Sequence, residues 1–139
     1  MKFKDDVVAA RFADMNKLAQ TIATEMDQWS QKNYGIELTI TATCSDYRED
    51  KELGRESDTH RTRRAWDVRV RDLPESLIAE LCAYFRKKYN RYGAVASNAP
   101  QLIVYKPHGT GPHLHCQLNR KYALEQIDYS PKEPKIAGK

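Results

Sequence analysis

Apolar side chains recur at steps of three and four near the start of the chain, with polar side chains between them. The apolar stripe comprises Val8, Phe12, Met15, Ala19, Ile22, Met26 and Trp29. This spacing is that of an α-helix with one buried face, and Gly35 follows where such a helix would end. We therefore predict one N-terminal helix within residues 1–35. A stripe of methionine and aromatic residues can also line a ligand groove, but packing in the core is the simpler interpretation.

Two later segments alternate between apolar and polar residues, which is the pattern of half-buried strands. They are residues 36–44 and 65–71, and we predict a strand in each. In the second segment Trp66 and Val68 fall on one face and Asp67 on the other. The polar residues 45–64 between them show no period, which predicts a long loop. Loops of this length are uncommon in small domains and tend to carry function.

The second half of the chain predicts one more helix and three short strands. Pro74 favours a helix start, and apolar residues repeat at helical spacing from there to near Gly93. Strands are predicted near 94–97, at 101–105 and at 113–119. This order of elements predicts an α+β domain in which helices flank a mainly antiparallel sheet.

Composition limits the domain count and the cellular setting. The 139 residues suit a single domain, which we assign to residues 1–129, and the residues 130–139, rich in Pro and Lys, predict a disordered tail.

The net charge of +4 permits a polyanionic partner but does not require one. No apolar run approaches the ~18 residues of a transmembrane helix. The start of the chain, MKFKDDVVAARFADMNK, carries acidic residues and lacks the apolar stretch of a secretory signal, so we expect synthesis in the cytoplasm without a signal peptide. The oligomeric state stays open.

The histidines are clustered rather than scattered. His108, His113 and His115 lie within eight residues. On the strand predicted at 113–119, His113 and His115 share one face, about 7 Å apart, because side chains repeat every second residue. The other face is apolar, with Leu114, Cys116 and Leu118. Two imidazoles on one strand face can be incidental, so the pair alone does not establish a site.

His60 and Asp67 add a second half to this site. His60 lies just before the strand that carries Asp67, and two histidines with one carboxylate suit zinc with an open fourth position, as in catalytic sites. Asp67 can equally be a surface acid paired with Arg64 or Arg69. The three cysteines have no paired metal-ligand spacing and are predicted to be reduced thiols.

The run SDTHRTRRAWDVRV at residues 57–70 resembles the S-x-H-x-x-G-R-A-x-D signature of the zinc D-Ala-D-Ala and L-alanyl-D-glutamate peptidases. These enzymes belong to the lysostaphin, D-Ala-D-Ala peptidase and hedgehog superfamily. The HLHC at 113–116 resembles the terminal zinc-ligand strand of hedgehog amino-terminal domains and of phage cell-wall peptidases. Tyr47-Arg48 resembles the Tyr-Arg pair that precedes the signature. The resemblance spans residues 36–120 and excludes the N-terminal helix and the tail.

The resemblance implies a hedgehog-like fold and a zinc-dependent peptidase acting on the stem peptides of peptidoglycan. It places zinc on His60, Asp67 and His115, and a base or transition-state stabiliser at His113. Arg48 takes the place of the arginine that faces a carboxylate or carbonyl group of the substrate. The chain would then resemble an endolysin of a bacteriophage or prophage, acting on the cell wall after release at lysis.

Three departures from the family pattern bear on catalysis. The signature glycine is replaced by Arg63 and its serine by Asp58. The acidic base that many members carry three residues before the last ligand is replaced by Pro112, and residues 81–124 contain no Asp or Glu. Either His113 acts as the base, or the site binds zinc without hydrolysing a bond.

The same acid-free stretch is rich in basic residues, which would attract an anionic substrate if they line the site. They are Arg86, Lys87, Lys88, Arg91, Lys106, Arg120 and Lys121. Any one of them can equally belong to an ordinary solvated surface.

Two other classes of protein remain as alternatives. His-Leu-His also resembles the metal-binding strand of HUH-type single-strand DNA endonucleases, and Tyr129 in Tyr-Ser-Pro-Lys matches the spacing of their tyrosine nucleophile. That reading leaves His60 and Asp67 without a role. The second alternative is a zinc-stabilised binding module without catalytic activity, which the missing acid favours.

Overall fold

The fold is built on a five-stranded sheet with helices on both sides. The computed structural model describes residues 1–96, 98–107 and 111–130, so His108 and nearly all of the predicted tail lie outside the described residues. The elements, in chain order, are β1 (Lys2–Phe3), α1 (Asp6–Phe12), α2 (Lys17–Tyr34), β2 (Thr39–Ala42), α3 (Tyr47–Glu52), β3 (Ala65–Arg69), α4 (Glu75–Tyr89), β4 (Ala94–Ala96), β5 (Ala99–Gln101), β6 (Ile103–Lys106) and β7 (His113–Gln117). Short 3₁₀ turns lie at Asn90–Tyr92 and Arg120–Tyr122.

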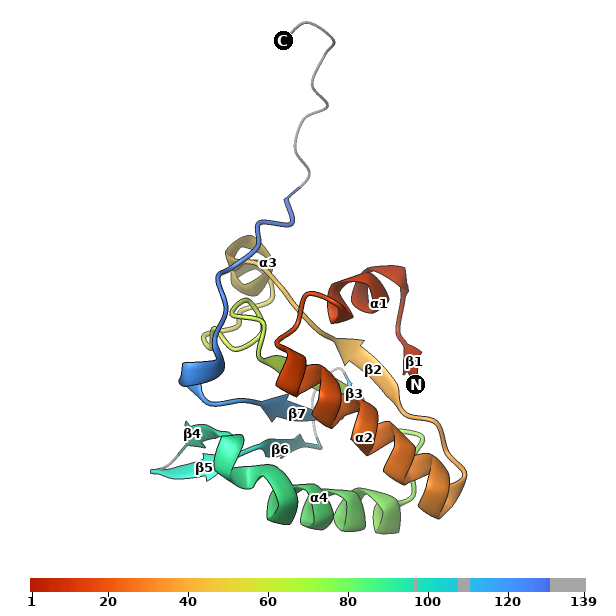
Figure 1. The fold of residues 1–139 in the computed structure, drawn as a ribbon. Helices are drawn as coiled ribbons and strands as arrows, with labels where there is room; N and C mark the ends of the chain where they lie inside the picture. Colours follow the sequence, from red (N-terminus) through yellow and green to blue (C-terminus); the bar gives the residue numbers. More distant parts are fainter. Residues whose placement is uncertain (97, 108–110, 131–139) are drawn as a thin grey trace, which may run out of the picture.

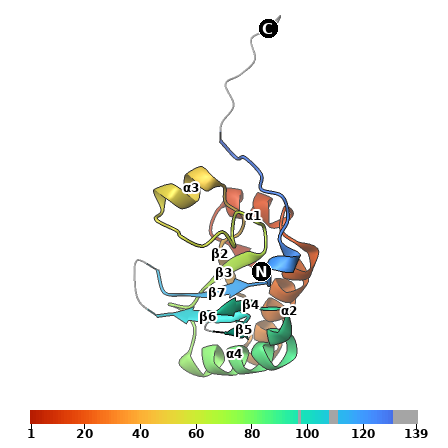
Figure 2. The ribbon, with the colours of Figure 1, turned by 90° about the vertical axis from the view of Figure 1, so that its left-hand side faces the viewer.

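The strand order in the large sheet is β1-β2-β3-β7-β6, and β4 and β5 form a separate hairpin. All neighbouring strands of the large sheet are antiparallel except β1 and β2, which are parallel. Helices α2 and α4 cover one face of the sheet, whereas α3 lies on the other side (Figures 1 and 2). The protein is therefore of the α+β class with a mainly antiparallel sheet, as the element order predicted.

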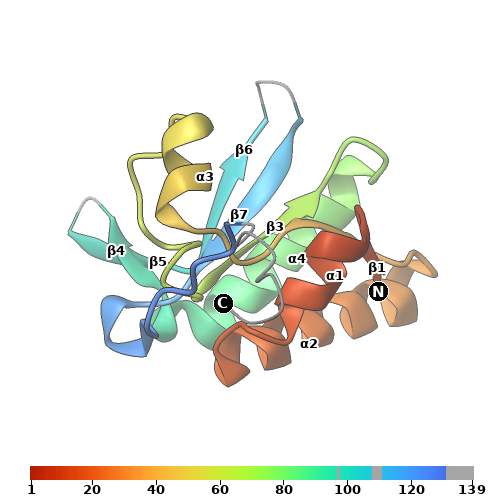
Figure 3. The ribbon, with the colours of Figure 1, turned by 90° about the horizontal axis from the view of Figure 1, so that it is seen from above.

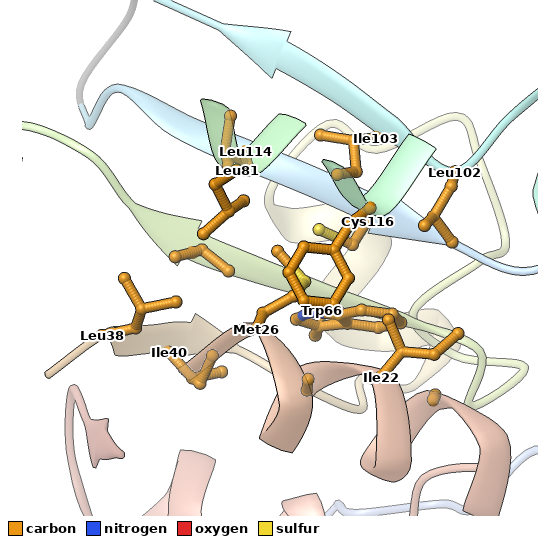
Figure 4. Close-up of a cluster of buried hydrophobic side chains, with 14 of the residues drawn as sticks. Ile22, Met26, Leu38, Ile40, Trp66, Leu81, Leu102, Ile103, Leu114 and Cys116 are labelled. Carbon is orange, nitrogen blue, oxygen red and sulfur yellow. The ribbon is translucent and has the colours of Figure 1, made fainter. Parts of the chain in front are cut away.

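The core fills the space between the sheet and helices α2 and α4. Figure 4 shows Trp66 of β3 packed between side chains of α2 and of β7, and Trp66 is fully buried. Leu114, Cys116 and Leu118 are also buried, which confirms the predicted apolar face of the last strand. Because side chains alternate along a strand, the opposite face of β3 and β7 is free to carry polar groups.

The N-terminal helix differs from its prediction, because there are two helices instead of one. Helix α1 ends at Phe12, and the side chain of Asn16 accepts a hydrogen bond of 2.8 Å from the backbone N–H of Leu18 to begin α2. Asparagine at a helix start stabilises the new turn more than it would stabilise a helix interior. Gly35 ends α2 with φ +66°, as predicted.

The polar segment 45–64 is not structureless. It contains α3, which starts with a capping box in which Asp46 and Glu49 each accept a hydrogen bond from the other's backbone N–H. This signal is local and was present in the sequence. The prediction missed it because the helix has only six residues and no apolar stripe. In the described part of the chain, no helix combines the length and apolarity that crossing a membrane requires.

Candidate metal centre

The pairing of β3 with β7 brings the two halves of the candidate site together. In their antiparallel register Asp67 lies directly opposite His115, so the two side chains project from the same face of the sheet. Figure 3 shows these strands side by side at the middle of the sheet. His60 reaches the same point from the end of the polar segment, and its carbonyl accepts hydrogen bonds from the backbone of Ser45 and Arg63.

One carboxylate oxygen of Asp67 is the meeting point of the site. Its Oδ1 lies 3.3 Å from Nε2 of His60 and 3.0 Å from Nδ1 of His115. Ligand atoms of the three residues all lie within 4.8 Å of one another. The three residues are 4%, 7% and 9% exposed for His60, Asp67 and His115, so water has little access to these atoms.

In each imidazole the outer nitrogen, which is the one that faces away from Asp67, forms a hydrogen bond with another residue. His60 Nδ1 lies 2.7 Å from the carbonyl oxygen of Thr43, which can only accept, so Nδ1 carries the proton. His115 Nε2 lies 3.1 Å from Oε1 of Gln117, and Nε2 of Gln117 donates to the Gln101 carbonyl at 3.2 Å. That second bond fixes the orientation of the amide, so His115 Nε2 must donate. In the neutral rings the lone pairs on His60 Nε2 and His115 Nδ1 therefore face Asp67.

Three hydrogen-bond acceptors that converge in a buried space need a cation between them, either a proton or a metal ion. Ligands of a tetrahedral zinc at 2.0–2.1 Å would stand about 3.3 Å apart. The two distances at Asp67 Oδ1 are close to that value. The residues present thus fit a metal ion held by two imidazoles and one carboxylate, and a tetrahedral ion held by these three residues would have a fourth position for another ligand.

The electrostatics of the site keep Asp67 ionised. Burial by itself raises the pKa of the Asp67 carboxyl, but the charge of His60 and hydrogen bonds from both histidines outweigh it and hold that pKa far below its ordinary value. For His115, burial dominates and lowers the pKa of the imidazole despite the hydrogen bond to Asp67. Metal binding requires an ionised carboxylate and deprotonated ligand nitrogens, so a metal ion would displace any proton that a histidine shares with Asp67.

His113 lies beside this group but is more exposed. Its Nε2 is 3.6 Å from Oδ2 of Asp67, and 27% of its side chain is exposed. Its Nδ1 lies 2.8 Å from the carbonyl oxygen of Gly111, so Nδ1 donates and Nε2 is the nitrogen left to accept a proton.

Arg48 is not brought into contact with this group. It lies on α3, and its guanidinium bonds to Glu52 at 3.3 Å and to Ser130 at 3.0 Å. Its predicted role toward a substrate rests on the family resemblance alone.

The positions that depart from the signature have clear local roles. Asp58 accepts hydrogen bonds from Arg64 at 2.8 Å and from Arg120 at 3.2 Å, which connects the segment before His60 to the turn that follows β7. Arg63 has φ +66°, the left-handed conformation that favours glycine. A glycine in the signature suits the same backbone geometry. The backbone carbonyl of Pro112 accepts a hydrogen bond from the backbone N–H of Val70, and its side chain has no acidic group.

The sequence analysis assigned a function to neither Gln117 nor Thr43, although Gln117 falls on the same strand face as His113 and His115. The alternation of β7 was a signal for Gln117. The contact between Thr43 and His60 joins residues 17 positions apart, and no local pattern reveals it.

The side chain of Tyr129, the nucleophile of the nuclease alternative, contacts Asp14 and Arg11. Its hydroxyl donates to Asp14 at 2.6 Å, and the Arg11 guanidinium lies 3.7 Å from the ring centroid. Burial and the hydrogen bond to Asp14 raise the pKa of the phenol well above its ordinary value. Both effects make this hydroxyl a poor nucleophile.

We compared the chain with protein-family models, with curated proteins and with solved structures, and none of the three comparisons returned a match.

Proposed function

We propose that this protein is a zinc-dependent peptidase that cleaves stem-peptide bonds of peptidoglycan, with a fold like that of the hedgehog and D-Ala-D-Ala peptidase superfamily. The observation that carries the proposal is the convergence of His60 Nε2, His115 Nδ1 and Asp67 Oδ1 in a buried space, with both outer imidazole nitrogens donating elsewhere. The arrangement of the signature residues and the His-Leu-His strand supports the family and the substrate class.

The donor set favours zinc over calcium or magnesium, because two of the three ligands are imidazole nitrogens. Zinc bound here would polarise a scissile carbonyl and lower the pKa of a bound water to about 7. His60, Asp67 and His115 would hold it, while Thr43 and Gln117 keep the two imidazoles in the tautomers that ligation needs.

His113 is the group that we assign to proton transfer. Its free Nε2 lies 3.6 Å from the second oxygen of Asp67, and it is the most exposed of the three histidines at the site. It can therefore accept a proton from an attacking water and return it to the leaving amine. Action on the cell wall after release from a phage-infected host remains part of the proposal, supported by the family resemblance only.

A second candidate is a zinc-stabilised binding module without hydrolytic activity. The observation that favours it is Pro112 at the position of the usual acid, within a stretch from residue 81 to 124 that contains no Asp or Glu. The His113→Ala variant separates the two candidates. A peptidase loses hydrolysis and keeps its zinc, whereas a binding module keeps both its zinc and its biological activity.

The first test is the metal content of protein purified without a histidine tag, measured by mass spectrometry. We expect about one zinc per chain in the wild type and in His113→Ala, and none in His60→Ala. Digestion of muropeptides by the zinc-loaded protein then tests the peptidase. An absence of metal in the wild type would refute the proposal and leave single-stranded DNA as the next substrate to try.

A further inference from the structure

A row of basic side chains runs across the same sheet face as the metal centre, one step along the strands. On β3, β7 and β6 the metal row consists of Asp67, His115 and Val104, which lie opposite one another in register. The next residue on the same face of each strand belongs to the basic row, made up of Arg69, His113 and Lys106, also in register. Rows on one face are about 7 Å apart, and neighbouring strands about 5 Å.

The two outer members of the basic row have no carboxylate of their own. Arg69 is half-buried and Lys106 exposed, and neither forms an ion pair with any residue that the structure describes. Other basic residues of the acid-free stretch are already engaged: Lys88 bonds to a glutamate of α2, Arg120 to Asp58, and Arg86 to a carbonyl of β6. Of the basic residues predicted in the acid-free stretch, Lys106 belongs to the basic row, and Arg69 of β3 joins it across His113.

We infer that the basic row is a subsite for a carboxylate of the ligand, held by Arg69 and Lys106 on either side of His113. The inference rests on the proposed function, because the metal would bind the reacting carbonyl of the same ligand. The register sets the geometry: a carboxylate held by this row lies one row, about 7 Å, from the metal-bound atom. Arg69 offers a planar pair of donors and Lys106 a mobile point charge, a combination that suits a carboxylate approaching from the open side.

The test measures binding rather than turnover. The probes are two short hydroxamates of equal length, which bind zinc through their oxygens and end in either a carboxylate or a carboxamide. Their affinities for the zinc-loaded protein are measured by calorimetry at low ionic strength, where charge screening is weak. We expect the carboxylate probe to bind the wild type about tenfold more tightly, from one or two charge-assisted hydrogen bonds.

Each of Arg69→Gln and Lys106→Gln should reduce this preference, and the double variant should abolish it. Lys87→Gln is the matched control, because Lys87 is exposed on α4, across the sheet, and it should leave the preference unchanged. Circular dichroism and zinc stoichiometry show whether each variant is folded and loaded. If Arg69→Gln fails to fold, Lys106→Gln on the edge strand still decides the outcome.

The possible failures are distinguishable. If the protein binds zinc but binds the two probes with equal affinity, the carboxylate subsite is overturned and the metal centre still stands. A third probe ends in a phosphonate. If it binds the wild type more tightly than the carboxylate probe does, by a margin that the double variant loses, the choice of carboxylate is overturned. Failure to bind zinc at all would overturn both the proposed function and this inference.

Discussion

Gln117 should control the zinc affinity without touching the metal. It is 9% exposed, and within the described residues its Oε1 accepts the shortest hydrogen bond of His115 Nε2, at 3.1 Å; the hydroxyl of Thr59 lies at 3.4 Å. In Gln117→Leu the imidazole loses the partner that holds its proton on Nε2. The ring is then free to turn or to carry its proton on Nδ1, and Nδ1 is the atom that faces Asp67.

The size of the effect follows from what is lost. Removing the outer partner of a ligating histidine typically weakens metal affinity by 10–100-fold, which is about 1.4–2.7 kcal/mol. Gln117→Leu should therefore bind zinc more weakly by that factor. Gln117→Glu keeps an acceptor of the same length and adds charge, so it should match or exceed the wild-type affinity. Gln101→Leu is the control, because Gln101 contributes its backbone carbonyl to this network and not its side chain.

The assay is competition for zinc with a chromophoric chelator, at fixed pH, on variants shown by circular dichroism to be folded. An NMR measurement of the ring nitrogens of His115 in the metal-free protein provides an independent reading of the tautomer. Unchanged zinc affinity in Gln117→Leu, with the protein folded, would refute the argument that this hydrogen bond prepares His115 for ligation.

Three further predictions concern stability and can be checked by chemical denaturation. Because Arg63 has φ +66°, Arg63→Gly should be more stable than Arg63→Ala by about 1 kcal/mol; equal stabilities would contradict the backbone argument. Gly93→Ala should lower the free energy of unfolding by about 1–3 kcal/mol, because the added methyl carbon would clash with the backbone nitrogen of Leu102. Gly111→Ala meets no described atom within 4 Å and should leave that free energy unchanged. Burial alone would raise the pKa of Asp58, but the neighbouring arginine charges lower it. The Asp58 carboxylate therefore stabilises the fold above pH ~3.9, and this stabilisation is lost as pH falls below that value. The wild type should accordingly lose its advantage in stability over Asp58→Asn in acid, and an advantage that grows in acid would show the sign to be wrong.

Local patterns were sufficient where a structural feature depends on neighbours in the chain. The alternation along 113–119 correctly predicted that Leu114, Cys116 and Leu118 face the hydrophobic core and that His113 and His115 share the opposite side. Pro74 and the helical spacing after it predicted α4, and Gly35 predicted the end of α2. In each case the physical cause is the period of the backbone or the conformational preference of a single residue, and both act over a few positions.

Tertiary structure decided what depends on register and on distant partners. The sequence proposed His60, Asp67 and His115 as a set, but only the antiparallel register of β3 and β7 places Asp67 opposite His115. A shift of one residue would have turned Asp67 toward the other face. The same register places Arg69 and Lys106 on either side of His113. Strand faces can be predicted from one chain segment at a time, whereas register is set by the packing of the whole core, and the chemistry of this site depends on that register.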